Sequence, residues 1–231
     1  MPAVGELFAV RELVRLPARK SALSGAPKGD GRTIVLFPGY STADRFLYPL
    51  ARFLRSRGHE VAGWGLGRND GDVFGKIDRV RAHVSSLAEE TGRPVSLLGW
   101  SLGGVFAREV ARDAPEHVHH VVTLGTPLHG PPETVSYRIY TPETVDEIKT
   151  AIKERALQAI DVPMTAFFSK SDRIVPWQNC IDEHSPLVEN VEVSSTHIGM
   201  TIDPDIWQVV ANRLSVAKPG PRPEGLIIRR H

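Results

Sequence analysis

The sequence predicts an α/β domain whose sheet is mostly parallel, has six strands or slightly more, and carries helices on both faces. Short apolar runs alternate along the chain with stretches in which apolar residues recur at helical spacing. Strands connected through helices pair in parallel, because each helix returns the chain to the same edge of the sheet. The expected strands lie near 33–37, 59–64, 95–100, 118–124, 164–169 and 190–194, and the expected helices near 43–57, 73–91, 102–113, 144–160 and 204–216.

Local signals support the individual elements in chain order. The strand at 33–37 consists of β-branched and aromatic residues, and the strand near 95–100 is an apolar run that follows a Gly-Arg-Pro turn. The helix at 102–113 repeats apolar residues at helical spacing until Asp113-Ala114-Pro115 stops the pattern. The run 164–169 is again apolar throughout, and the segment after it that precedes the last helix alternates like a half-buried strand.

Length and composition fit one globular domain without a metal or a nucleic-acid partner. The chain has 231 residues, of which 41% are hydrophobic and 24% charged. The formal net charge of +1 gives no electrostatic case for nucleic-acid binding. The one cysteine, Cys180, allows no intramolecular disulfide and fits no metal-site spacing. No stretch is long and apolar enough for a membrane-spanning helix.

The domain is expected to span residues 33–217, after an N-terminal helix and linker at 1–32 and before a Pro-rich tail at 218–231. Apolar residues between Leu7 and Val14 recur at helical spacing. This helix is expected to pack on the domain's own sheet, with a membrane-surface or partner-binding role as the alternative. The first residues lack the basic region and long apolar core of a secretory signal, so we expect a cytoplasmic protein.

The most informative motif is Gly99-Trp100-Ser101-Leu102-Gly103, which lies between a strand pattern and a helix pattern. Gly-x-Ser-x-Gly in this context predicts a nucleophile elbow, a tight turn that exposes the serine hydroxyl. Side chains at Gly99 and Gly103 would collide with neighbouring backbone. The helix begins beside the serine, so its positive end points to where an oxyanion would form. The alternative is a serine that only caps the helix.

Two further residues are predicted to complete the chemistry of Ser101. A serine hydroxyl is a weak nucleophile and needs a base and a group that orients the base. His197 and Asp172 each follow a predicted strand, and the carboxyl ends of parallel strands meet at one edge of the sheet. We therefore expect both beside Ser101. Asp182 and His184 are the nearest rivals, and they rank lower because neither follows a strand end.

With these residues the chain resembles the α/β-hydrolase superfamily, and more narrowly its compact lipase- and esterase-like serine hydrolases. The chain order Ser, Asp, His is the order that this superfamily uses. Gly63–Asn69 and Thr123–Gly130 look like further landmarks of the group, and the resemblance runs from about Ile34 to about Leu214.

The resemblance implies a carboxylic ester hydrolase that works through an acyl-enzyme and needs no cofactor. Ser101 would attack, His197 would relay the proton and Asp172 would hold the imidazole. The oxyanion hole would consist of the backbone N–H groups of Leu102 and of Tyr40, which follows an early strand. An acyltransferase, thioesterase or amidase on the same residues is the alternative, as is a catalytically silent binding protein.

The resemblance also implies a lid at 128–161, which is too short for a large cap and predicts a fairly open cleft. Trp100, Tyr137 and Tyr140 are candidate contacts for a small-molecule or lipid ester; the alternative for the two tyrosines is that they only anchor the loop. The natural substrate, its acyl chain length and the oligomeric state are left open.

Two other clusters carry weaker signals. His117, His119 and His120 straddle a strand entry, where neighbouring side chains point to opposite faces, and no carboxylate matches them, so we expect no metal there. Arg68 and Asn69 follow a predicted strand end and are candidates to brace the active crevice.

Overall fold

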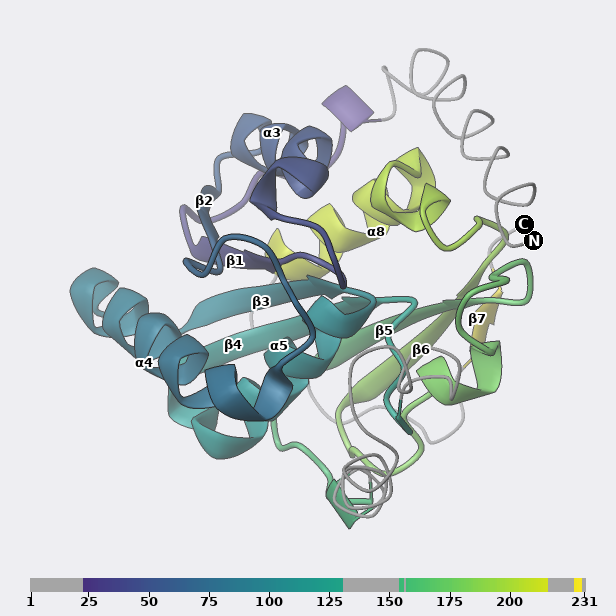
Figure 1. The fold of residues 1–231 in the computed structure, drawn as a ribbon. Helices are drawn as coiled ribbons and strands as arrows, with labels where there is room; N and C mark the ends of the chain where they lie inside the picture. Colours follow the sequence, from purple (N-terminus) through teal and green to yellow (C-terminus); the bar gives the residue numbers. More distant parts are fainter. Residues whose placement is uncertain (1–22, 131–153, 156, 216–226, 230–231) are drawn as a thin grey trace.

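The computed structural model describes residues 23–130, 154–155, 157–215 and 227–229, and in them seven strands form one sheet (Figure 1). The strand order is β2-β1-β3-β4-β5-β6-β7, and every neighbouring pair is parallel. The strands are β1 (Thr33–Phe37), β2 (Glu60–Gly63), β3 (Val95–Trp100), β4 (Val118–Leu124), β5 (Met164–Ser169), β6 (Val188–Val193) and β7 (Ile227–Arg229).

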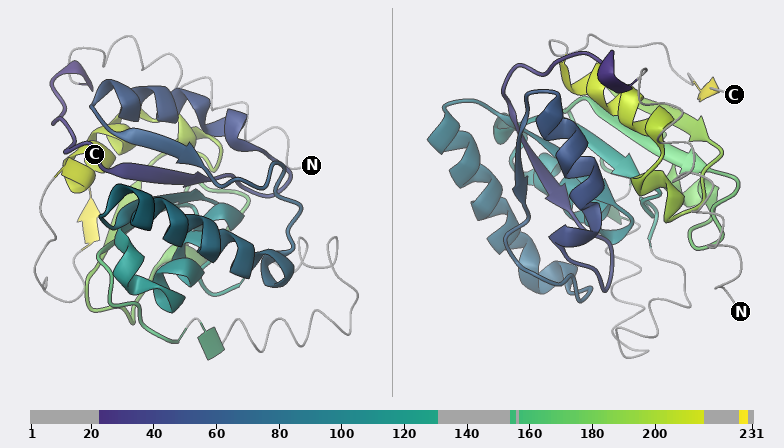
Figure 2. Two further views of the ribbon diagram at one scale, coloured as in Figure 1. Left: turned by 90° about the vertical axis from the view of Figure 1, so that its left-hand side faces the viewer. Right: turned by 90° about the horizontal axis from the view of Figure 1, so that it is seen from above.

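Helices cover both faces of the sheet (Figure 2). On one face lie α3 (Tyr48–Ser56) and α8 (Pro204–Ser215), and on the other lie α4 (Val73–Thr91) and α5 (Leu102–Asp113). Four short 3₁₀ turns complete the described elements: η2 (Asp44–Leu47), η3 (Pro115–His117), η4 (Trp177–Cys180) and η5 (Gly199–Thr201). The expected fold class, a mostly parallel sheet with helices on both faces, is confirmed.

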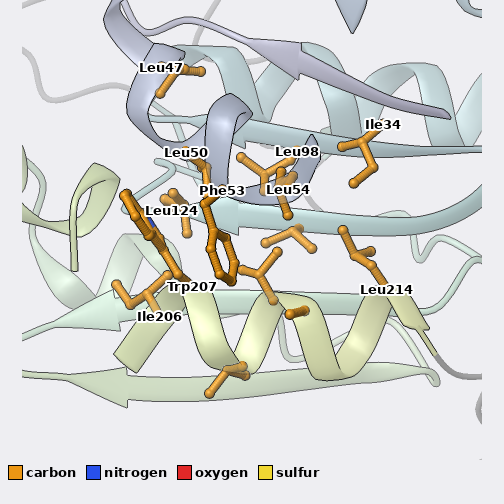
Figure 3. Packing of buried hydrophobic residues seen from close by; sticks show 14 of the residues in the cluster. Ile34, Leu47, Leu50, Phe53, Leu54, Leu98, Leu124, Ile206, Trp207 and Leu214 are labelled. Carbon is orange, nitrogen blue, oxygen red and sulfur yellow. The ribbon is translucent and has the colours of Figure 1, made fainter. Parts of the chain in front are cut away.

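The two apolar layers follow from the alternation of side chains along the strands. In β1, Ile34 and Leu36 belong to the layer under α3 and α8, whereas Val35 and Phe37 belong to the layer under α4 and α5. Figure 3 shows the first layer, in which Phe53 of α3 stacks on Trp207 of α8 with ring centroids 5.2 Å apart. Each large side chain buried in this way contributes about 1.5–3 kcal/mol to folding.

Most predicted boundaries agree with the structure, with three exceptions and two regions that the structure does not describe. The expected helix at 43–57 is a 3₁₀ turn followed by α3, and β6 starts at Val188, earlier than expected. Residues 227–229, which the sequence analysis assigns to a tail, form the edge strand β7 beside β6. The expected N-terminal helix and most of the expected helix at 144–160 lie outside the described residues.

The parallel arrangement brings the carboxyl ends of β1, β3, β5 and β6 to one edge of the sheet, and the residues that follow them make up the candidate site. Among the described residues, no helix combines the length and the apolar character needed to cross a membrane.

Candidate active site

Ser101 occupies a strained turn between β3 and α5. Its backbone angles are φ 53° and ψ −127°, a region that non-glycine residues rarely adopt and that costs about 1–3 kcal/mol. The Ser101 N–H donates to the carbonyl of Leu124 at 2.8 Å, which fixes the turn against β4. Among the described residues, the Ser101 hydroxyl makes no capping bond to α5. The capping alternative therefore has no support in the geometry.

The glycines around Ser101 are required by close backbone packing. A Cβ on Gly99 would overlap the backbone of Gly104, and a Cβ on Gly103 would overlap the carbonyl oxygen of Phe37 at the end of β1. Only a residue without a side chain allows α5 to begin this close to β3 and β1. A side chain at either glycine would therefore collide with backbone, as the motif predicts. The end of β1 packs directly against the start of α5.

His197 and Asp172 form a buried hydrogen-bonded pair. The distance from His197 Nδ1 to Asp172 Oδ2 is 2.6 Å, and the two side chains are 3% and 1% exposed. The other carboxylate oxygen, Oδ1, accepts the N–H groups of Ile174 at 2.8 Å and Val175 at 2.9 Å. Because a carboxylate only accepts hydrogen bonds, the imidazole proton sits on Nδ1 and leaves Nε2 able to take a proton.

Several contacts connect this pair to the serine turn. Gly125 follows Leu124, whose carbonyl holds Ser101, and a Cβ on Gly125 would lie 3.0 Å from His197 Nδ1 and 3.1 Å from Asp172 Oδ2. Within the described part of the chain no hydrogen bond joins the Ser101 hydroxyl to the imidazole. In hydrolases without substrate such bonds are often long and tighten only in the complex.

The loop that carries His197 is anchored on both sides. Before it, the buried Ser195 hydroxyl donates to the Asp203 carboxylate, just ahead of α8. After it, the Gly199 N–H donates to Thr196 Oγ1 at 3.1 Å. These supports could not be predicted from the sequence, because an isolated Ser or Asp in a loop carries no signal of its distant partner.

Trp100 has a structural role that the sequence analysis missed. A contact of Trp100 with the substrate stays a prediction. In the structure its indole is 5% exposed, stacks on Phe46 at 4.6 Å and donates its N–H to the His197 carbonyl at 2.9 Å. Tyr137 and Tyr140, the other predicted contacts, lie outside the described residues, as does most of the expected lid at 128–161.

The two predicted oxyanion donors flank Ser101. Leu102 is the first residue of α5, where a backbone N–H has no partner inside the helix. On the other side, a Cβ on Gly39 would lie 2.7 Å from the Trp100 ring and 3.2 Å from Ser101 Cβ. Tyr40 follows, with 38% of its surface exposed, and its N–H has no partner among the described residues.

The rival residues have structural partners of their own. Asp182 is fully buried and pairs with Arg108 of α5 at 3.0 Å, and its carboxylate also accepts the N–H groups of His184 and Ser185. Burial alone would raise the pKa of Asp182, but the Arg108 charge and these hydrogen bonds outweigh burial and hold the pKa below its ordinary value. Asp182 therefore braces the loop.

The histidines near β4 contact separate partners. His117 Nδ1 lies 2.7 Å from the Ser85 hydroxyl, and His120 Nε2 lies 3.0 Å from the Thr165 hydroxyl inside the sheet. These contacts tie α4 to the entry of β4 and β4 to β5.

No protein-family model matches the chain, although parts of it are similar to known proteins. It is 36% identical over 122 residues to polyketide synthase ThaQ of Burkholderia thailandensis, a match that covers 50% of this chain and 6% of the synthase. It is 32% identical over 106 residues to a triacylglycerol lipase of Pseudarthrobacter phenanthrenivorans, with 42% of this chain and 33% of the lipase covered. The chain thus spans about a third or less of the length of these relatives.

Solved structures share the fold over most of this chain. Lipase B of Aspergillus fumigatus superposes with a TM-score of 0.65 at 19% identity, over 84% of this chain and 55% of the lipase. MGS-MChE2, an α/β-hydrolase enzyme from the sediment metagenome of the Mar Chica lagoon, gives 0.56 at 17% identity, over 80% of this chain and 91% of that one. The chain therefore has the α/β-hydrolase fold that these structures share.

Proposed function

We propose that the protein is a serine hydrolase that cleaves carboxylic esters through an acyl-enzyme intermediate. The observation that supports this most is the neighbourhood of a strained serine, whose hydroxyl caps nothing, and a buried imidazole bonded to a carboxylate. Strained backbone persists where the surrounding structure enforces it, and such residues cluster at functional sites. A serine beside an oriented base is the arrangement that nucleophilic catalysis needs.

In the proposed mechanism, Ser101 Oγ attacks the ester carbonyl while His197 Nε2 takes the hydroxyl proton. Asp172 accepts the Nδ1–H bond, so it keeps the useful tautomer and stabilises the imidazolium that forms. The N–H groups of Leu102 and Tyr40 bind the carbonyl oxygen as it becomes negative, and one such donor typically contributes about 3 kcal/mol to the transition state. The imidazolium then protonates the leaving alcohol. In the second half of the reaction, His197 takes a proton from water as the water attacks the acyl group, and the imidazolium returns that proton to Ser101 Oγ as the acid leaves.

The proposed substrates are small-molecule or lipid esters. A partial relative is named a triacylglycerol lipase, which supports esters of fatty acids as one class. Trp100, Tyr137 and Tyr140 are proposed to contact the acyl or alcohol group. A rate that jumps when the substrate passes from dissolved to emulsified would indicate a lipase, and a rate that saturates below that point would indicate an esterase. We propose no cofactor; a cytoplasmic location and the lack of a nucleic-acid partner stay predictions of the sequence.

The first prediction tests the nucleophile. A fluorophosphonate probe is expected to label one serine, Ser101, and Ser101→Ala is expected to lower kcat by at least about a thousandfold, because the hydroxyl that forms the acyl-enzyme is gone. The measurements are mass spectrometry of the labelled peptide and hydrolysis of a short-chain nitrophenyl ester. Ser86→Ala, which removes an exposed hydroxyl of α4, is the control and is expected to behave as the wild type.

A Ser101→Ala protein that still hydrolyses the ester at the wild-type rate would contradict the proposal. A wild-type protein that neither hydrolyses esters nor reacts with the probe would favour the silent binding protein. Product analysis with an added alcohol or amine detects acyl transfer. Hydrolysis rates on matched amide and thioester substrates detect amide and thioester cleavage.

A further inference from the structure

Ser41 shares with Ser101 a positive backbone φ, which is uncommon for a residue other than glycine. Within the described ranges, these two are the non-glycine residues with a positive φ, 64° at Ser41 and 53° at Ser101. Ser41 belongs to the segment after β1, Pro38–Thr42, which we term the oxyanion loop. Because an L-residue adopts such angles only when neighbouring contacts enforce them, the contacts of the oxyanion loop indicate what its geometry serves.

Asn69, in the loop after β2, supplies most of these contacts. It is fully buried. Its backbone N–H donates to the Thr42 carbonyl at 2.8 Å, and its carbonyl accepts the Ser41 N–H at 2.6 Å. Its side-chain Nδ2 donates to the Pro38 carbonyl at 2.8 Å, while Oδ1 accepts the Gly71 N–H at 3.1 Å. One residue thus holds the oxyanion loop at its start and at its end.

The peptide unit between Gly39 and Tyr40 is fixed by a second residue. The Gly39 carbonyl accepts both the Thr42 N–H at 3.1 Å and the Thr42 Oγ1 hydroxyl at 2.8 Å. In a planar trans peptide the carbonyl and the N–H point in opposite directions. The Tyr40 N–H therefore points away from Thr42, and among the described residues it has no partner. A donor with a fixed direction and no partner is what a developing oxyanion requires.

Arg68 closes the outer side of the same turn. Its Nε donates to the Ser41 carbonyl at 3.1 Å, and its terminal nitrogen contacts the Ser41 hydroxyl. The carbonyls of Gly39 and Ser41 thus accept hydrogen bonds from Thr42 and Arg68, which do not belong to the proposed catalytic group.

We propose that Asn69, Thr42 and Arg68 are positioning residues that orient the Tyr40 N–H toward the reacting carbonyl oxygen. This inference rests on the proposed hydrolase function. If these contacts only close a surface loop, their loss lowers stability and leaves the chemical step unchanged. If they orient the donor, their loss lowers kcat while substrate binding is retained, since the donor acts mainly in the transition state.

The test compares Asn69→Ala and Thr42→Val with Asp72→Ala. Thr42→Val keeps the side-chain shape and removes the hydroxyl donor. Asp72→Ala removes the cap of α4, a 2.8 Å bond from the Gly75 N–H, in the same loop as Asn69 and without touching the oxyanion loop. The measurements are kcat and KM on a soluble ester, the Ki of a trifluoromethyl ketone whose hemiketal oxyanion occupies the hole, and Tm.

Asn69→Ala and Thr42→Val are expected to lower kcat by about ten- to hundredfold, with KM changed by less than about threefold and the ketone Ki raised by a similar factor. Thr42→Ser, which keeps the hydroxyl, is expected to restore most of the loss seen in Thr42→Val. Asp72→Ala is expected to lower Tm alone. If Asn69→Ala changes kcat and Ki no more than Asp72→Ala does, the positioning role is overturned.

Hydrogen exchange separates failure of this inference from failure of the hydrolase function. The amides of residues 39–45 are expected to exchange faster in Asn69→Ala and Thr42→Val than in the wild type or in Asp72→Ala. Unchanged exchange overturns the positioning role whether or not the protein hydrolyses esters. A wild-type protein without activity or probe labelling overturns the hydrolase function, and with it the role of Tyr40.

Discussion

Trp100 joins the strand that carries the proposed nucleophile to the loop that carries the proposed base. Its ring stacks on Phe46, and its N–H donates to the backbone carbonyl of His197. The same geometry recurs at Trp207, which stacks on Phe53 and donates to the Thr201 carbonyl at 3.0 Å. Of these two tryptophans, only Trp100 connects two parts of the candidate site. Comparing substitutions at Trp100 and Trp207 therefore separates an effect on stability from an effect on catalysis.

We predict that Trp100→Phe lowers kcat/KM by about ten- to hundredfold, because a buried carbonyl that loses its donor costs about 1–3 kcal/mol and the His197 loop is then free to shift. Trp207→Phe loses the equivalent bond. It is expected to lower Tm about as much as Trp100→Phe does, with little change in kcat/KM. Ester kinetics and thermal unfolding of both variants provide the measurement. Equal losses of activity in the two variants would show that Trp100 has no special link to the site.

At the scale of elements, a buried ion pair ties α5 to the loop that follows η4. Arg108 and Asp182 are 4% and 0% exposed, and the Arg108 guanidinium also donates to the Gln158 carbonyl at 3.3 Å. The Ser185 hydroxyl donates to the same carboxylate at 2.8 Å. The pair therefore connects α5, which begins after Ser101, to the chain downstream of Asp172.

We predict that Asp182→Asn lowers the free energy of unfolding at pH 7 by about 3–5 kcal/mol, because it removes the charge of Asp182 from a buried ion pair. The pKa of Asp182 is lowered in the folded protein, so its contribution is present above the unfolded pKa of about 3.9 and is lost as the pH falls through the folded pKa. The variant should therefore lose less stability in acid than the wild type does.

Chemical denaturation at neutral and acidic pH measures both effects. Asp78→Asn, which breaks an exposed pair with Arg81, is the control and is expected to cost less than about 1 kcal/mol. Equal stabilities of the two variants would contradict the role given to the buried pair.

At the scale of the whole molecule, the residues before β1 pack near the amino ends of β1 and β2. The candidate site lies at the carboxyl ends of the strands. Arg57 holds the carbonyl of Ser24 at 2.7 Å and accepts the Gly29 N–H at 2.7 Å. His59, just before β2, is 3% exposed and packs directly on Gly29. Burial lowers the pKa of His59 and outweighs the opposing hydrogen bond to the Arg32 carbonyl and the charge of Asp30.

We predict that global stability falls as the pH drops below about 6.5, because the unfolded chain binds a proton at His59 that the folded chain resists. His59→Gln is expected to reduce this slope between pH 7 and 5, which denaturant unfolding at several pH values measures. His184→Gln, at an exposed histidine, is expected to leave the slope unchanged. A wild-type slope in His59→Gln would assign the effect to another group.

Sequence patterns predicted the elements whose signals are local. Helices α4 and α5 agree with their expected ranges because their apolar spacing and their stop residues lie within the segment itself. The start of β6 was missed because Glu189 is buried there, paired with Arg213 of α8 at 2.5 Å, and a charge inside an apolar run resembles a loop. Strand β7 was missed because it follows a Pro-rich stretch.

In the candidate site, too, the residues with a local sequence signal could be predicted, whereas their distant contacts could not. Ser101, Asp172 and His197 are candidates from the sequence because each follows a strand and parallel strands end at one edge, and their catalytic roles stay predictions. The bond between Trp100 and His197, across 97 positions, depends on a distance that no local pattern contains. Asn69 was a candidate to brace the crevice, but its contact with the Pro38 carbonyl, 31 positions away, could not be predicted from the sequence.

The strand order also divides the chemistry along the polypeptide. The first four strands, β2-β1-β3-β4, occupy one half of the sheet and carry Ser101 and the oxyanion loop, while β5, β6 and β7 occupy the other half and carry Asp172 and His197. The site is therefore a seam between two consecutive fragments of one chain. A cut between β4 and β5 would leave neither piece with a complete set of reacting groups, and only their reassembly could restore turnover.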